Sequence, residues 1–586
     1  MPAAPGTTAV VPGAYRSSRR PGVPGATRCR GTAVRRLGRV TRTRVLLELD
    51  LTEAPPETGP ADPLGLLRRR RPTLRAVVDA LAEAATDPAV AGLVAKVGGR
   101  MPLARAQELR DAVRAFGASR PTVAWAETFG EGDPGTAAYL LATGFGQVWL
   151  QPSGDLGLTG VAAETNFLRG LLDKAGLEPQ FAQRHEYKNA VDRLTRHGYT
   201  DAFREAAGRL VASAYEQVVD GIAQARGLTA ERVRELVDAA PLSAGQALAA
   251  GLVDRVGYRD EVYAALPADA ELLFLARYSR AGGPRKLAAR VRRRNAPVVG
   301  LVTVAGAIQQ GRSRRSLLSP GAGAGSDTVS AALRAAGRDD AVRAVVLRVN
   351  SPGGSYVASD VIWREVGRLR AAGKPVVASM GDIAGSGGYF VAMGADAIVA
   401  QPGTLTGSIG VFSGKVVTAG LLERLGVATD AVAEGRNARM FTMAQGFDDA
   451  QWRRLDEWLD RVYADFVGKV AQGRGLTPER AHELARGRVW TGADAYERGL
   501  VDELGGLRRA AELARSRAGL PAGAELRRFP QVGPLDRLSP PKSSGDRAAA
   551  VTGADWWSGW GSLAGTAARL GLSPDGPLSM PPLTLG

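Results

Sequence analysis

The sequence repeats itself, and this repetition constrains the fold more than any other feature of the chain. The segment that begins at Tyr139 (YLLATGFGQVWLQP) matches the segment that begins at Tyr389 (YFVAMGADAIVAQP), an offset of 250 residues from Tyr139 to Tyr389. The match continues at the same offset, without a gap, to Gly176 and Gly426. Self-similarity at one fixed spacing indicates that a structural unit is used twice. We therefore expect two copies of one domain.

Each copy alternates short apolar runs with helix-like segments. The first copy opens with a strand candidate over 44–50, and the second restarts the same pattern with an apolar run over 296–305. In the first copy, strand candidates over 90–97 and 122–126 alternate with helix candidates over 77–85 and 104–116. Such alternation is typical of βαβ units and a parallel sheet. The sequence thus predicts a tandem α/β fold.

Length and composition divide the chain further. A chain of 586 residues exceeds the usual size of one domain. We expect a disordered basic arm over 1–40, a first domain over 41–284, a basic connector over 285–295, a second domain over 296–518, and a tail rich in Pro and Gly over 519–586.

Arginine side chains crowd the arm and the connector and contribute to a net charge of +17. Solvated basic linkers are the interpretation that we favour. Peripheral contact of the arm with anionic lipid is an alternative. Nucleic-acid binding is not expected, because no stacking pattern of aromatic and basic residues accompanies the charge.

The sequence gives little support for a membrane-spanning protein, a secreted protein, or a protein whose fold or chemistry depends on cysteine. No run of about 18 apolar residues indicates a transmembrane helix, and the first forty residues lack the apolar region of a signal peptide. The one cysteine, Cys29, lies in the arm, which argues against a disulfide framework or a thiolate metal site.

A serine in a glycine-rich turn is the main candidate for chemistry. Ser386 follows the apolar run 374–379 within MGDIAGSGGY, and a helix-like run begins at Tyr389. A strand, a tight turn and a helix place a serine hydroxyl at a helix N-terminus, where free N–H groups favour developing negative charge. The simpler alternative is that Ser386 only caps the helix.

A serine nucleophile needs a base, and the sequence favours lysine over histidine. His482 lies in a helix candidate where we expect a solvated surface position. Lys188 lies in the first copy, and the matching position of the second copy is Ala438. Conversely, Thr136 occupies the place of Ser386 in the first copy. The two copies are therefore complementary, although Lys188 could also be an ordinary surface lysine.

Three runs resemble the signature segments of the signal peptide peptidase A family, in its long, duplicated form known as protease IV. These runs are VNSPGGS ending at Ser355, SMGDIAGSGGY ending at Tyr389, and LTGSIGV ending at Val411. The resemblance covers roughly residues 45 to 515, and the segment EYKNA around Lys188 is similar to the family's lysine segment.

The resemblance implies a tandem duplication of a ClpP/crotonase-like ββα spiral domain and a serine endopeptidase without metal or cofactor. Ser386 would be the nucleophile, Lys188 the general base, and Ser408 the residue that orients the lysine. The N–H groups of Gly354 and Gly387 would form the oxyanion hole. Implied substrates are cleaved signal peptides and other short apolar peptides, and the implied assembly is a homotetramer.

The chain departs from the family in one respect. Long-form members commonly carry an N-terminal transmembrane anchor, and none is evident here. We therefore expect a membrane-associated or cytoplasmic protein. Two other functions remain open: a crotonase-type acyl-CoA enzyme on the same fold, and a non-catalytic scaffold that binds peptides or membrane.

Overall fold

The computed structural model describes residues 44–59, 71–281, 296–315, 323–530, 553–554 and 578–580. These residues belong to one compact unit that starts at Thr43. The expected basic arm (1–40) and connector (285–295) lie outside the described residues. Within the described ranges, no helix combines the length and apolar character needed to cross a membrane.

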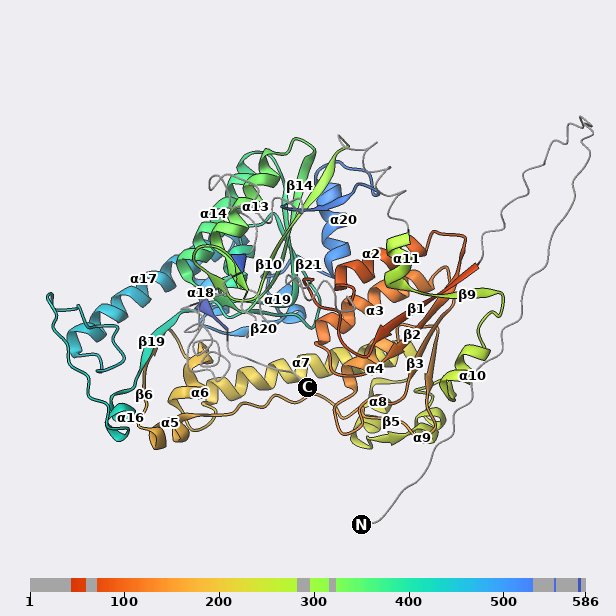
Figure 1. Ribbon diagram of the computed structural model, residues 1–586, viewed down its shortest axis with the longest axis horizontal. Coiled ribbons are helices and arrows are strands. Elements are labelled where there is room, and N and C mark those ends of the chain that lie inside the picture. Colours follow the sequence, from red (N-terminus) through yellow and green to blue (C-terminus); the bar gives the residue numbers. More distant parts are fainter. Residues whose placement is uncertain are drawn as a thin grey trace, which may run out of the picture. The chain divides into compact units, whose positions relative to one another are not determined.

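The first half is built on a six-stranded parallel sheet, with the strand order β8-β4-β3-β2-β1-β9 (Figure 1). Its strands are β1 (Arg44–Leu51), β2 (Val90–Val97), β3 (Thr122–Ala126), β4 (Gln147–Leu150), β8 (Arg255–Val256) and β9 (Ala270–Phe274). Strands, helices and their alternation agree with the βαβ pattern predicted from the sequence.

The second half repeats this sheet strand by strand. Its strands run in the order β21-β17-β16-β14-β10-β22, the same succession as in the first half. They are β10 (Val298–Ala305), β14 (Val342–Ser351), β16 (Val376–Gly385), β17 (Ala397–Ala400), β21 (Glu503–Leu504) and β22 (Leu526–Arg528). The internal duplication is therefore present in three dimensions.

One expected boundary is wrong. The sequence pattern places the end of the second domain at residue 518, but β22 pairs in parallel with β10 at the sheet edge, as β9 does with β1. The second domain therefore extends through Arg528. The strand is only three residues long and two of them are arginines, so no apolar run marks it in the sequence.

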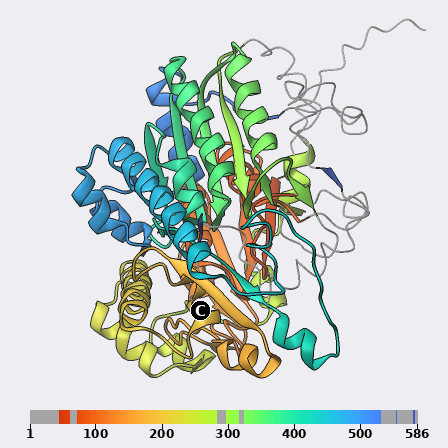
Figure 2. The ribbon, with the colours of Figure 1, turned by 90° about the vertical axis from the view of Figure 1, so that its left-hand side faces the viewer.

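Helices cover both faces of the second sheet, which explains why its strands are almost continuously apolar. Val345, Leu347 and Val349 of β14 face a core shared with α13 (Ser326–Arg338) and α14 (Tyr356–Ala371), two helices seen side by side in Figure 2. Ala344 and Val346 face the opposite way, onto α20 (Leu507–Arg517).

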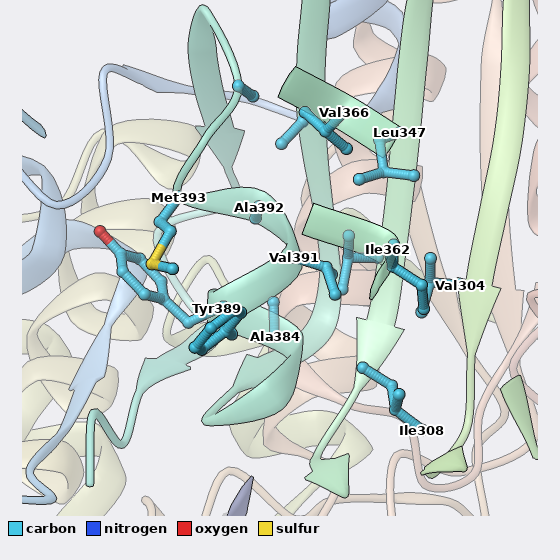
Figure 3. Packing of buried hydrophobic residues seen from close by; sticks show 14 of the residues in the cluster. Val304, Ile308, Leu347, Ile362, Val366, Ala384, Tyr389, Val391, Ala392 and Met393 are labelled. Carbon is cyan, nitrogen blue, oxygen red and sulfur yellow. The ribbon is translucent and has the colours of Figure 1, made fainter. Parts of the chain in front are cut away.

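A short helix, α15 (Gly387–Ala392), is embedded in this core. Tyr389, Val391 and Ala392 are fully buried, and Figure 3 shows them packed beside side chains of β14 and α14. The Tyr389 hydroxyl donates a hydrogen bond of 2.9 Å to the carbonyl of Leu500. The residue that precedes α15 is therefore held by a rigid element.

Several contacts join the halves, and two of them involve paired strands and buried charges. The first is an antiparallel pair of strands, β6 (Glu178–Gln183) from the first half and β19 (Phe412–Val417) from the second, which run alongside each other in Figure 1. The second is a buried ion-pair cluster. Arg348 of β14 contacts Glu57 at 2.9 Å and Glu108 at 2.8 Å, and both carboxylates come from the first half.

Candidate active site

Ser386 occupies a strained turn between β16 and α15. Its backbone has φ 54° and ψ −113°, a region that L-residues rarely adopt. The Ser386 N–H donates to the carbonyl of Gly407 at 2.7 Å, and its carbonyl accepts from the N–H of Phe390 at 2.8 Å. Strained backbone held in this way is frequent at functional sites. The turn has the strand–turn–helix form predicted from the sequence.

Lys188 meets this serine from the other half of the chain. Its Nζ lies 2.8 Å from the Ser386 Oγ, and 2.9 Å from both the backbone oxygen and the Oγ of Ser408. All three side chains are completely buried. The structure thus brings together Ser386, Lys188 and Ser408, which lie as much as 220 residues apart in the sequence.

Burial lowers the pKa of the Lys188 amine well below that of an ordinary lysine. A charged amine in an apolar site loses its hydration, so the neutral form is favoured. Among the described residues, no carboxylate is hydrogen-bonded to Nζ to oppose this effect. A neutral amine has a lone pair that can accept the proton of the Ser386 hydroxyl.

The β6–β19 pair carries Lys188 to this position. Directly after β6, the Arg184 N–H donates to the carbonyl of Val411 at 2.9 Å, and the Tyr187 N–H donates to the carbonyl of Arg486 at 3.2 Å. The lysine loop therefore lies against two segments of the second half.

Gly487, a residue not predicted from the sequence to be part of the site, makes this close approach possible. It has φ 85°, and a Cβ at this position would overlap the backbone of Lys188. The first copy has Ala239 at the matching place, at the offset that relates Gly227 to Gly475. A glycine present only in the copy opposite the lysine is the signal that could have identified it.

Ser408 follows β18 (Leu405–Gly407), which pairs with the end of β16 so that Gly407 lies opposite Gly385. The two serines therefore leave neighbouring strands side by side. Ser408 also has a positive φ of 50°. Its counterpart in the first copy, Leu158, is a buried apolar side chain that offers no hydroxyl.

The two glycines expected to form the oxyanion hole lie together. Gly354 belongs to β15 (Gly353–Gly354), and a Cβ on Gly387 would lie 3.1 Å from the Gly354 nitrogen. Gly387 is the first residue of α15, so its N–H has no acceptor within the helix. The backbone nitrogen of Gly354 therefore lies close to Gly387, the residue that directly follows Ser386.

The described residues of the first half contain no equivalent site. Thr136 opens α4 (Thr136–Ala142) where Ser386 precedes α15, but its Oγ1 donates to the carbonyl of Gly160 at 3.0 Å. The position that matches Lys188, Ala438, is exposed. Among the described residues there is one serine–lysine contact of this kind, and both halves contribute to it.

His482 is not the solvated surface residue predicted from the sequence, because it is half-buried. Its Nδ1 lies 2.9 Å from the Tyr463 hydroxyl, and its ring packs against that of His185 at 4.8 Å. In the described part of the chain, no histidine is hydrogen-bonded to Ser386. There is likewise no group of three His, Cys, Asp or Glu side chains there that could hold a metal ion.

Known proteins match this chain over most of its length. The model of a family described as Peptidase family S49 matches residues 114–273 and 368–521, together more than half of the chain. The chain is 32% identical to Protease 4 of Salmonella typhi over 456 residues, which cover 75% of this chain and 72% of that relative. Over 398 residues it is 31% identical to the chloroplastic serine protease SPPA of Arabidopsis thaliana; this stretch is 67% of the chain but spans only 58% of that relative's length.

Among solved structures, a ClpP1 mutant from Listeria monocytogenes aligns with 36% of this chain and 94% of its own chain, at 13% identity and a TM-score of 0.23. The two regions that the family model matches fall in the two halves of the chain. Together with the shared strand order, they confirm the predicted tandem duplication of one α/β domain.

Proposed function

The chain is a serine protease of peptidase family S49, and from that premise we propose that it cleaves peptide bonds with Ser386 as nucleophile and Lys188 as general base. The observation that carries the proposal is the 2.8 Å separation of the Lys188 Nζ and the Ser386 Oγ, both of which belong to completely buried side chains. Family membership agrees with the resemblance seen in the sequence.

The reaction proceeds through an acyl-enzyme. The neutral Lys188 amine removes the hydroxyl proton as the Ser386 Oγ attacks the substrate carbonyl. The C–N bond then breaks, and the ammonium of Lys188 returns the proton to the leaving amine. A water molecule, deprotonated by Lys188 in the same way, attacks the ester and releases the acid, which regenerates the Ser386 hydroxyl.

Ser408 acts as a positioning residue in this scheme. Its hydroxyl and carbonyl oxygens both accept hydrogen bonds from Nζ, so they direct the remaining lone pair of the neutral amine toward Ser386. The N–H groups of Gly354 and Gly387 stabilise the negative charge that develops on the substrate oxygen. Loss of one such donor typically lowers kcat by about 100- to 1000-fold.

We further propose that the substrates are extended, apolar peptides such as signal-peptide remnants. Apolar side chains surround the site. The expected homotetramer and the peripheral membrane contact through the basic arm stay predictions. Exposed apolar residues between 425 and 443 offer a surface on which a second copy could pack: Leu425, Val427, Val432, Phe441 and Met443.

Site-directed variants test the proposal. Ser386→Ala and Lys188→Ala should each reduce hydrolysis of a fluorogenic apolar peptide by at least about 1000-fold, because nucleophile and base act as one unit. Thr136→Ala is the matched control, since it removes a hydroxyl from the same turn of the other copy and should leave activity unchanged. Wild-type turnover by either the Ser386 or the Lys188 variant, with folding intact, would refute the proposed mechanism.

A further inference from the structure

A short strand near the end of the sequence lies on the candidate oxyanion loop. Residues Leu578 and Ser579 form β24, which pairs antiparallel with β15, so that Leu578 lies opposite Gly354 and Ser579 opposite Gly353. The Met580 N–H continues the ladder with a 2.8 Å hydrogen bond to the carbonyl of Pro352. Three consecutive residues of the chain thus extend along the loop that precedes α14.

The side chains of this strand are buried in apolar surroundings. Leu578 is completely buried in the main core of the second half, and only 4% of Met580 is exposed. Met580 packs in a cluster that contains residues of both halves: Leu210, Ile383, Leu405 and Val489. Its side chain also lies against Gly385, because a Cβ there would be 2.5 Å from the Met580 Sδ. Gly385 directly precedes Ser386, so Met580 reaches the nucleophile turn.

This edge of β15 is where a peptide would be expected to bind. On its other side β15 already pairs with β11 (Ile308–Gln309), which leaves one edge for an added strand. An extended peptide gains affinity by pairing with an exposed strand edge, and pockets for alternate side chains give specificity. β24 has both features, since its backbone pairs with glycines and Met580 fills an apolar pocket.

We propose that residues 578–580 are a built-in peptide ligand that occupies the substrate-binding edge of β15 and competes with substrates. The inference rests on the proposed function, because it assigns this edge to peptide substrates of the Ser386 site. A substrate must displace the segment before its carbonyl can reach the Ser386 hydroxyl. The chain therefore regulates access to its own active site.

The segment has one defect as a ligand. The Ser579 Oγ is buried without a hydrogen-bond partner among the described residues, and a buried hydroxyl without a partner weakens binding. Weaker binding allows substrates to displace the segment from the site. Two kinds of substitution should therefore change the binding of residues 578–580 to β15 in opposite directions. Loss of the Ser579 hydroxyl should strengthen this binding, and loss of the apolar side chains of Leu578 and Met580 should weaken it.

Binding can be measured without turnover in the full-length chain carrying Ser386→Ala. If residues 578–580 fill the site nine-tenths of the time, removing them should lower the Kd of an added peptide about tenfold. A fluorescently labelled apolar peptide should therefore bind the Leu578→Asp/Met580→Asp variant with a Kd about tenfold lower than that of the protein with an unsubstituted tail. Ser579→Ala should instead raise the Kd. Equal Kd values for all three tails would overturn the inference, whatever the catalytic mechanism.

Activity measurements with Ser386 intact separate this inference from the proposed function. The Leu578→Asp/Met580→Asp variant should hydrolyse peptide with a lower KM and an unchanged kcat. A synthetic peptide with the sequence of residues 576–582 should inhibit it competitively, and the same peptide with Asp at positions 578 and 580 should not. Equal KM values in the variant and the wild type, with turnover still dependent on Ser386, would overturn the inference and leave the protease mechanism standing.

Discussion

At the scale of single residues, the proposed mechanism requires a neutral lysine. Burial lowers the pKa of Lys188, and below that pKa the protonated amine has no lone pair to accept the Ser386 proton. We expect kcat/KM to rise with pH through the lowered pKa and to level off before the ordinary lysine value of about 10.4. Peptide hydrolysis measured over a pH series tests this, and a profile that falls over the same range would contradict it.

Two substitutions serve as controls for the pH profile. Lys188→Arg should be inactive at every pH, because arginine does not deprotonate in a protein. Lys188→Met should also be inactive but at least as stable as the wild type near neutral pH. The reason is that folding lowers the lysine pKa, which costs stability below the unfolded pKa and nothing above it. Thermal unfolding of Lys188→Met and wild type at several pH values measures this difference, which should shrink as pH rises.

The sequence could single out Ser386 and Lys188 because each differs from its counterpart in the other copy, whereas Ser408 followed from the resemblance to a known family. Comparison of the two copies within one chain shows which candidate functional side chains are present in one half and absent from the other. Gly487 was missed because its role depends on contact with the backbone of Lys188, which is more than the length of one domain away in the sequence. His482 was misplaced because its partner, Tyr463, lies on a different helix, and no local pattern predicts that contact.

At the scale of elements, the main strands can be predicted from apolar runs in the sequence. The short strands that bring the two halves together at the site cannot. β6 and β19 form a separate two-stranded sheet between the halves, and neither has a long apolar run. β24 is shorter still and pairs with a loop more than 200 residues earlier. Pairing between distant short strands depends on tertiary context, which a single sequence does not display.

The β6–β19 pair should be essential for activity although it lies outside the parallel sheets. A Cβ on Gly414 of β19 would overlap the backbone of Gln180 and Phe181 in β6, so Gly414→Val should separate the strands and displace Lys188. A displacement of about 1 Å can cost on the order of 100-fold in rate. We expect a loss of kcat of that order, measured on an apolar peptide, with a small change in unfolding temperature.

The neighbouring substitution Ser413→Val is the matched control. It places the same side chain on the same strand at a half-buried position, where valine suits a strand. This variant should keep wild-type kcat. Equal activity of the Gly414 and Ser413 variants would show that the strand pair does not position the lysine.

At the scale of the whole molecule, the two halves are held together by charge as well as by strands. Arg348 is 2% exposed, and its guanidinium donates to Glu57 and Glu108 of the first half and to the Ser379 hydroxyl. Burial raises the pKa of Glu108 against the opposing effect of Arg348. Burial also acts to raise the pKa of Glu57, but there Arg348 outweighs it and keeps the pKa below its ordinary value. The negative charges of the two buried glutamates are therefore compensated only while Arg348 is present.

Arg348→Met should destabilise the molecule by about 3–5 kcal/mol near neutral pH, because it leaves two buried carboxylates without a cation. Without Arg348 both carboxyl pKa values would lie above their unfolded values, so the deficit should be small below about pH 4.3 and should grow as pH rises through the folded pKa values. Arg454→Met removes an exposed arginine paired with Glu457 and should cost less than about 1 kcal/mol at any pH. Denaturant unfolding of both variants at acid and neutral pH measures the difference in the free energy of unfolding. If Arg348→Met loses the same stability at both pH values, the loss comes from packing and not from unpaired charge.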